Sequence, residues 1–179
     1  MNYSELVHVY EQLESTSKRL AKTATISEVL KKTPTEDLHT MVLLLQGQIF
    51  ANWDANEAGV ATRLIVKAIS TASGESKEKV EQVWKNTGDL GKAAEQLFGK
   101  KKQHTLFSSK LTVKKVMENL RKLPSIEGMG SVDRKIQLIA ELLTSASSSE
   151  AKYIVKTILS QLRVGVGEGS LRDAIVWAN

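Results

Sequence analysis

Apolar residues recur at intervals of three and four along nearly the whole chain, and this spacing most limits what the chain can fold into. It places apolar side chains on one face of an α-helix, whereas the alternation typical of a half-buried strand is scarce. Only two prolines interrupt the pattern. Clear stripes are Leu38, Met41, Val42, Leu45 and Ile49, and Ile154, Val155, Ile158 and Leu162. We therefore predict an all-α fold of about ten short helices packed as one compact domain.

Residues that commonly begin or end helices stand beside these stripes. Ser, Thr and Asp accept hydrogen bonds from N–H groups at helix starts, and glycine adopts the left-handed conformation at helix ends. The predicted N-terminal caps are Thr35, Ser76, Asp89, Thr112 and Ser131. The predicted C-terminal glycines are Gly74, Gly88 and Gly99. The basic loop 99–110 has no apolar period, so we expect it to be the least ordered part.

The composition excludes several classes of protein. The 179 residues include no cysteine, which rules out disulfides and thiolate metal sites. Three isolated histidines, His8, His39 and His104, lack metal-ligand spacing, so we predict no metal site. The longest apolar run, Met41–Leu45, is too short for a membrane span. The charged N-terminus is unlike a signal peptide, and we expect a cytoplasmic protein with no membrane partner.

Two parts of the sequence resemble each other. Residues 35–49 align with residues 149–163 at a shift of 114, and a Glu-Gly turn and a further helix follow each of them. Internal repeats usually reuse one supersecondary unit, although helical stripes alone can produce such a match. The repeat predicts two pseudo-symmetric halves, roughly 1–74 and 111–179, within a domain that spans residues 1–179.

Three glycines, Gly165, Gly167 and Gly169, follow Arg163 within the stretch RVGVGEGS. Glycine permits a positive φ or the close approach of another molecule. A phosphate-binding P-loop needs a lysine after the last glycine and a strand before the loop, and a dinucleotide-binding turn also follows a strand. Neither condition is met, because the preceding stripe is helical. The segment is therefore either a turn between two helices or a surface approached by something larger.

Two more polar segments, LESTSKRL (Leu13–Leu20) and IEGMGSVDRK (Ile126–Lys135), place Ser or Gly at a helix start, with Lys or Arg within the next turn. The N–H groups and positive dipole end of a helix start suit a phosphate oxygen, and basic side chains add charge. A net charge of +5 and a pI near 9.3 also favour an acidic partner. Each segment alone is more simply a helix cap, so their number carries the argument for contacts to a duplex backbone. The candidate DNA-binding residues are Ser15, Ser17, Lys18, Arg19, Gly128, Gly130, Ser131, Arg134, Lys135, Arg163, Gly165, Gly167 and Gly169.

The order of the motifs resembles the N-terminal DNA-binding domain of archaeal and eukaryotic-type ATP-dependent DNA ligases. The motifs are YEQLESTSKRLAKT, NTGDLGKAAEQLF, TLFSSKLTVKKV, EGMGSVDRK and EAKYIVKTILSQLRVGVGEGSLRDAI, and they cover nearly the whole chain. The resemblance implies an all-α fold with two similar halves that encircles nicked double-stranded DNA together with two catalytic domains. It implies contacts across the minor groove, mainly to phosphate and sugar, without sequence preference. It also implies a role in replication and repair at the prokaryotic nucleoid.

The same resemblance implies chemistry that this chain lacks. Ligases of this kind attack ATP with the lysine of a Lys-x-Asp-Gly motif, and no such motif occurs in the 179 residues. We expect the nucleotidyltransferase and OB-fold domains, with ATP and Mg²⁺ as cofactors, in a longer protein. We assign no catalytic residue and no cofactor to this chain, and a complete small enzyme is the weakest of the hypotheses. A free-standing paralogue is the alternative to a ligase fragment.

The stretch KKKQHTLFSS suggests a second partner. It resembles the Gln-x-x-hydrophobic-aromatic segment with which archaeal ligases dock on a PCNA-type sliding clamp, and its candidate docking residues are Gln103, Leu106 and Phe107. It has one aromatic residue where fuller motifs have two. One alternative is that Leu106 and Phe107 pack on their own domain. Another is that the chain is a helical adaptor that docks a clamp without binding DNA.

The docking hypothesis predicts that Phe107→Ala abolishes clamp binding and leaves the melting temperature nearly unchanged. An exposed aromatic anchor has no core to lose, but it carries much of the energy of a small contact. A core Phe107 would instead cost about 3–5 kcal/mol of unfolding free energy when truncated. A thermal melt and a clamp titration separate these outcomes, and a large drop in melting temperature or an unchanged clamp affinity contradicts docking.

Overall fold

Helices account for nearly all regular structure in residues 1–99 and 110–178, the part of the chain that the computed structural model describes. In this part, the only strand-like feature is an isolated antiparallel bridge between Asn2 and Thr112. The prediction of an all-α fold of about ten helices is therefore confirmed. The elements are α1 (Tyr3–Glu14), α2 (Arg19–Lys32), the 3₁₀ helix η1 (Thr35–Asp37), α3 (Leu38–Leu45), α4 (Thr62–Ser73), α5 (Lys77–Thr87), α6 (Leu90–Gly99), α7 (Val113–Arg121), α8 (Ser131–Thr144), α9 (Ser148–Ile158) and α10 (Glu168–Ala178).

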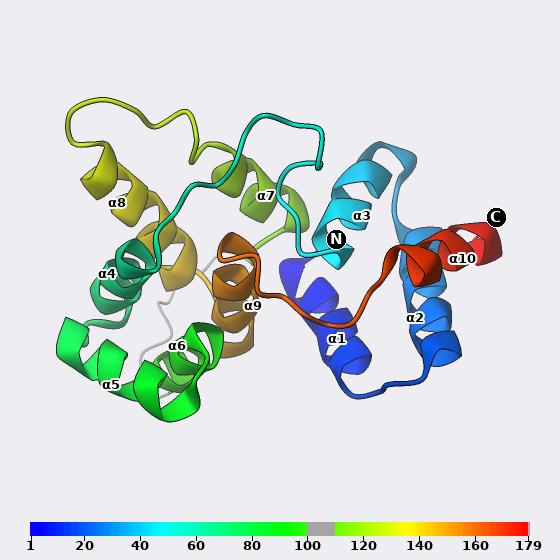
Figure 1. Ribbon diagram of the computed structural model, residues 1–179, viewed down its shortest axis with the longest axis horizontal. Helices are drawn as coiled ribbons and strands as arrows, with labels where there is room; N and C mark the ends of the chain where they lie inside the picture. Colours follow the sequence, from blue (N-terminus) through cyan, green and yellow to red (C-terminus); the bar gives the residue numbers. More distant parts are fainter. Residues whose placement is uncertain (100–109, 179) are drawn as a thin grey trace.

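The helices form two lobes with α1 and α9 between them (Figure 1). In this view α4, α5, α6 and α8 lie on the left, and α2 and α10 lie on the right. The main packing pairs are α6 with α9, α2 with α10, and α4 with α8. Two long connections cross between the lobes: the segment 46–61 leads from α3 to α4, and the segment 159–167 leads from α9 to α10.

Tyrosine side chains fill the centre where α1 meets α9. Tyr3, Tyr10 and Tyr153 have no exposed surface. The rings of Tyr10 and Tyr153 lie with their centroids 5.0 Å apart in a tilted arrangement, which is a favourable geometry for aromatic pairs. The Tyr10 hydroxyl donates a hydrogen bond to the Leu44 carbonyl at 2.9 Å, so its polar atom is satisfied within the core. This contact ties α3 to the α1–α9 centre.

Three of the five predicted N-terminal caps are confirmed. Ser76 accepts from the N–H of Lys79 at 3.2 Å, Thr112 from Lys115 at 3.1 Å, and Asp89 from Lys92 at 3.0 Å. Thr35 is not a cap, because it begins the 3₁₀ helix η1. Ser131 is not a cap either, because the preceding residue is the cap.

Two of the three predicted C-terminal glycines are also confirmed. Gly74 and Gly88 end their helices in the left-handed conformation, at φ +75° and +69°. Gly99 differs, since it is the last helical residue of α6 and has no positive φ. A residue that continues the helical conformation does not need the left-handed region, so glycine is not required there for its φ.

The two-half organisation stays a prediction, and two features support it. First, the starts of α1 and α7 exchange reciprocal hydrogen bonds, from the N–H of Tyr3 to the Leu111 carbonyl at 2.8 Å and from the N–H of Val113 to the Met1 carbonyl at 3.2 Å. Such reciprocity is what a two-fold relation between the halves requires. Second, α2 packs on α10 as α8 packs on α4, so the last helix of each proposed half packs against the second helix of the other.

The TGDLG motif, residues 87–91, lies where α6 packs against α9. Gly88 ends α5, and Asp89 caps α6. At Gly91, a Cβ atom would lie 2.7 Å from Cγ of Lys156 and 2.8 Å from the Lys152 carbonyl oxygen. Real Cβ contacts are not that short, so only glycine lets α6 approach the α9 backbone this closely. The motif therefore reflects close helix packing at the contact between α6 and α9.

A polar cluster spans the same contact and reaches the end of α1. Oε1 of Glu14 lies 3.1 Å from Nζ of Lys156, and Oε2 lies 3.4 Å from Nζ of Lys152. Oε2 also accepts a 2.9 Å hydrogen bond from the Tyr153 hydroxyl, and Lys156 lies 3.5 Å from Oδ2 of Asp89. Burial favours the neutral form of Glu14, but the hydrogen bonds from Tyr153 and Lys156 and the charges of both lysines outweigh it and lower its pKa below 4.5. Burial and the bond to Glu14 both raise the pKa of Tyr153, so its hydroxyl keeps its proton.

We predict that Gly91→Ala lowers the free energy of unfolding by about 1–3 kcal/mol, the usual cost of overpacking. The added methyl group must displace the α9 backbone at Lys152, because the Lys152 carbonyl cannot rotate away as a side-chain end could. Urea denaturation measures the loss. The matched control is Gly167→Ala, since a methyl group at Gly167 would meet no atom within 4 Å and the residue has no positive φ. Equal stability of the two variants would contradict close packing at Gly91.

We further predict that Glu14→Gln destabilises the protein by about 1–3 kcal/mol at neutral pH, because a charged hydrogen-bond acceptor is lost. The pKa of Glu14 is lower in the folded state than its ordinary value of 4.5, so its stabilising effect is present above that value and is lost as the pH falls through the folded pKa. The difference in unfolding free energy between wild type and variant should therefore shrink below pH 4.5. Glu118→Gln, on the exposed face of α7, is the control, and a difference that stays constant down to about pH 3 would contradict the prediction.

Candidate nucleic-acid interface

The structure joins two of the three predicted DNA-binding segments at the starts of α2 and α10. The Arg19 guanidinium forms an ion pair with Asp173 of α10, and Nζ of Lys22 donates to the Val164 carbonyl at 2.7 Å. Gly169 also lies close, since a Cβ there would be 3.3 Å from Nη2 of Arg19. We call the joined residues 15–22 and 163–173 the α2–α10 surface.

The first segment of this surface leaves its polar groups accessible. Ser15, Ser17, Lys18 and Arg19 are all exposed. Ser15 donates back to the Gln12 carbonyl at 2.7 Å, which ends α1, and the N–H of Lys18 donates to Oγ1 of Thr16 at 3.1 Å. No side chain caps the start of α2, so its first N–H groups have no capping side-chain acceptor.

The glycine segment, residues 163–169, and the residues just before it contain both non-glycine residues of the described chain that have a positive φ. Arg163 is exposed and has φ +49°, and Ser160 has φ +54°, so both are non-glycine residues in the left-handed region. Gly165 has φ +73°, a backbone conformation that favours glycine, and the end of the Lys22 side chain lies close to its Cα. The segment is not a direct turn between helices, because α9 ends at Ile158 and α10 begins at Glu168.

The third predicted segment contains Gly128, Gly130, Ser131, Arg134 and Lys135, and we call it the α8 segment. It lies at the start of α8, at the upper left of Figure 1 and away from the α2–α10 surface. Gly128 and Gly130 have φ of +83° and +74°, and Gly130 is the residue before α8. The Arg134 guanidinium donates to the Glu127 carbonyl at 2.6 Å, so it holds its own loop. Ser131, the first residue of α8, and Lys135 are half-buried. The structure therefore separates this segment from the other two by most of the width of the molecule.

A fourth helix start was missed by the sequence analysis. No side chain caps α4, which follows Ala61 and carries the exposed Arg63 in its first turn. Among the described helices, α5, α6, α7 and α9 have side-chain caps, whereas α2, α3, α4 and α8 do not. The available signal was the repeat itself, because a Glu-Gly turn and a further helix follow residues 35–49 as they follow residues 149–163. A search for caps alone could not find it.

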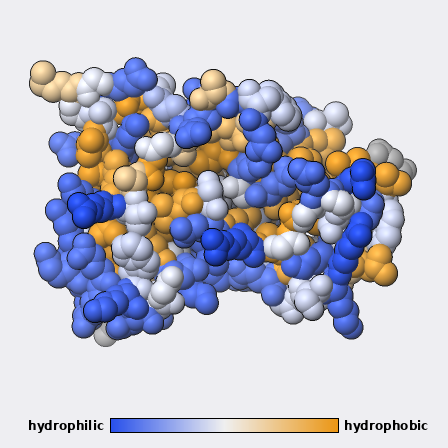
Figure 2. Space-filling model, viewed as in Figure 1, coloured by the Kyte–Doolittle hydropathy of each residue, from blue (hydrophilic) through white to orange (hydrophobic). Residues whose placement is uncertain are grey.

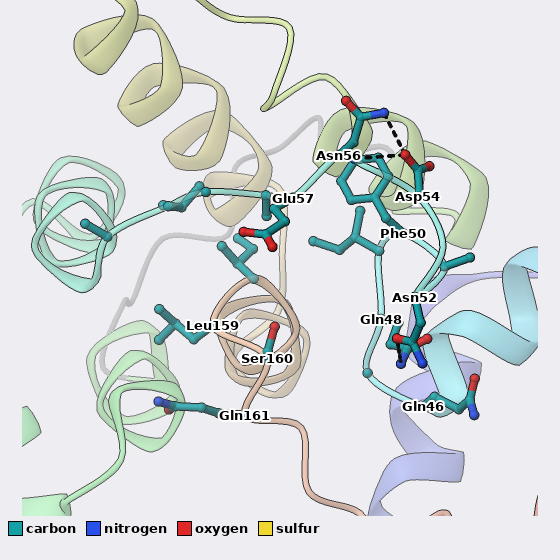
Figure 3. A pocket seen from close by; sticks show the side chains of 18 of the residues that line it. Gln46, Gln48, Phe50, Asn52, Asp54, Asn56, Glu57, Leu159, Ser160 and Gln161 are labelled. Carbon is teal, nitrogen blue, oxygen red and sulfur yellow. Dashed lines mark hydrogen bonds between the residues drawn. The ribbon is translucent and has the colours of Figure 1, made fainter. Parts of the chain in front are cut away.

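The hollow between the two crossing connections is a poor phosphate site. It measures about 790 Å³ and lies between residues 46–62 and the end of α9 (Figure 3). Amide side chains face it, and some bond to one another, as Gln48 does to Asn52 at 3.0 Å. Asp54 accepts from the backbone and side chain of Asn56 at 2.9 and 2.8 Å. None of the described lining residues is Lys or Arg, so nothing there offsets the charge of a nucleotide.

The hydropathy of the surface differs between the two lobes. Figure 2 shows hydrophilic side chains along α2 at the right, and apolar residues gathered in the hollow below the segment 46–61. On the α2–α10 surface, Lys18, Arg163 and Arg172 are exposed, and Arg19 is only partly neutralised by Asp173 because both side chains are solvated. This surface is therefore basic, as a polyanion partner requires.

Other predicted features can be placed only within the described residues. In residues 1–99 and 110–178, no group of three His, Asp or Glu side chains could hold a metal ion. No helix of that part is both long and apolar enough to cross a membrane. The clamp-docking residues Gln103, Leu106 and Phe107 lie outside it.

Comparisons with known proteins identify the family of the chain. Residues 2–176 match the family described as "DNA ligase N terminus". The chain is 47% identical over 178 residues to a DNA ligase of Methanobrevibacter smithii, and 42% identical over 178 residues to one of Thermococcus onnurineus. In both cases the match covers 99% of this chain and 32% of the relative, so the chain spans about a third of the length of these ligases. The chain therefore belongs to the DNA ligase N-terminus family.

Proposed function

We propose that this domain binds double-stranded DNA without sequence preference, as the DNA-binding part of an ATP-dependent DNA ligase. The observation that carries the proposal is the α2–α10 surface. Two segments far apart in the sequence meet there, and they bring together an open helix start, a glycine segment and several basic side chains. Open N–H groups and basic side chains bind phosphate oxygens, which are present in every DNA sequence.

The glycine segment suits close approach by a duplex backbone. Gly167 has open space around its Cα, so a sugar or phosphate can come within contact distance of the main chain. Arg163 and Lys18 are exposed, and their charges are available to phosphates. Contacts across the minor groove and the binding of nicked duplex are the finer parts of the proposal. They follow from the family to which the chain belongs, and the α8 segment would contribute contacts at a second place on the same duplex.

The activity of the whole protein is likewise a proposal. The relatives are named DNA ligases, so we propose that the whole protein joins DNA. The resemblance of the motifs further implies a role in replication and repair at the nucleoid, with ATP and Mg²⁺ acting in other domains. A PCNA-type clamp stays a predicted second partner, and no described residue favours the adaptor hypothesis over DNA binding.

We predict that Lys18→Ala and Arg163→Asn each weaken binding to unrelated duplexes by a similar factor and lower the log–log salt slope by about 0.9. Each removes one phosphate contact, and asparagine tolerates the positive φ of Arg163. Fluorescence anisotropy with intact and nicked duplexes over a range of salt concentrations measures both quantities. Lys85→Met, on the exposed face of α5, is the control for net charge.

Lys135→Ala in the same titration tests the α8 segment, with an expected fall in slope of about 0.9. If Lys18→Ala and Arg163→Asn both bind with the wild-type slope, the α2–α10 surface does not contact phosphate. If only Lys135→Ala keeps that slope, the α8 segment is a helix start and not a contact.

A further inference from the structure

Side-chain contacts hold the two segments of the α2–α10 surface together at both of its ends. At the outer end, Lys22 bonds to Val164 and Arg19 pairs with Asp173. At the inner end, Glu14 is the last residue of α1 and directly precedes Ser15, while Lys156 lies in the last turn of α9. The 3.1 Å contact between Glu14 and Lys156 therefore joins the chain just before the first DNA-binding segment to the helix just before the second.

Lys156 is built into this position. Its side chain is only 8% exposed, and its Nζ contacts both Glu14 and Asp89. The absence of a side chain at Gly91 leaves room for the Lys156 stem, because a Cβ there would lie 2.7 Å from its Cγ. The aromatic ring of Tyr153 lies 5.8 Å from the same nitrogen, and the Tyr153 hydroxyl bonds to Glu14. Side chains from α1, α6 and α9 thus converge on one buried ammonium group.

Such a cluster specifies position more than it stabilises the fold. Removing charged groups from water costs free energy that their mutual attraction only partly offsets, so an apolar replacement is often equally stable. The charges of Lys152 and Lys156 balance those of Glu14 and Asp89. Each ion pair joins one particular ammonium group to one particular carboxylate oxygen, so the contacts fix the relative position of the helices. Lys156 is too buried to reach a phosphate, so any effect on DNA must act through the residues that it contacts. Of its two carboxylate partners, Glu14 is the one that directly precedes the first DNA-binding segment.

We propose that Lys156 is a positioning residue for DNA binding. It holds the end of α1 against α9, and thereby sets the separation of residues 15–18 from residues 163–169. This inference rests on the proposed function, since the surface it positions is the one proposed to bind duplex DNA.

The test is Lys156→Met, which removes the charge and keeps an unbranched side chain. We expect duplex affinity to fall by roughly 2- to 30-fold, the range for side chains that act on a site through intervening contacts. The salt slope should stay at the wild-type value, because no phosphate contact is lost. Lys85→Met removes the same charge at an exposed position and should bind as wild type does. Measurements are made well below the melting temperature, where every variant is folded.

The second variant, Glu14→Gln, tests whether Lys156 acts through Glu14. If Lys156 acts through Glu14, the double variant should bind no more weakly than Lys156→Met alone, because both changes break the same contact. Amide hydrogen exchange should also become faster at residues 15–18 in each variant, while α5 stays protected. If Lys156→Met does not fold, Glu14→Gln decides by the same three measurements.

The outcomes separate this inference from the function on which it rests. A wild-type chain that does not bind duplex at all contradicts the proposed function. A wild-type chain that binds, with a folded Lys156→Met of equal affinity, overturns the positioning role alone. A salt slope lowered by about 0.9 would mean that Lys156 itself contacts phosphate, which also overturns the inference.

Discussion

The contact of α1 with α9 is the interaction on which the rest of the structure depends. The rings of Tyr10 and Tyr153 pack against each other at the centre, and Glu14 pairs with Lys152 and Lys156 at one end of the same contact. Several other helices attach to this pair: α3 through Tyr10, α6 through Gly91, and α7 through the start of α1. A helix pair with an aromatic centre and a charged end favours one register, because sliding would separate the buried Lys156 from its carboxylate partners.

The two crossing connections place the DNA-binding candidates. The segments 46–61 and 159–167 have little regular structure, and each sends a helix from one lobe to the other. They meet at Gly47, where a Cβ would lie 2.7 Å from Cβ of Leu162, so the crossing is close. As a consequence α10 packs on α2, and residues 163–169 lie beside residues 15–22. The basic surface therefore exists because the chain crosses over at this point.

Much of the fold could be predicted from local patterns. The spacing of apolar residues predicted the helices, and side chains such as Ser76 and Thr112 marked their starts, because both signals act within one turn of backbone. Ser131 was wrongly predicted as a cap, because Gly130 takes that place with a positive φ, and glycine has no side chain that would mark it as an N-terminal cap. The open start of α4 was missed because Ala61 is not a capping residue, so capping patterns do not mark it, although the repeat predicts a helix there.

What the sequence by itself determined is the class of fold, the family and the kinds of residue available to bind a polyanion. The tertiary structure alone decided which of these residues act together. It joined Arg19 and Lys22 to the glycine segment, left the α8 segment in the other lobe, and turned Arg134 back onto its own loop. It also revealed the contact between Glu14 and the buried Lys156, residues 142 positions apart. The reason is physical: periodicity and capping depend on neighbours in the chain, whereas a binding surface depends on which helices pack together across long loops.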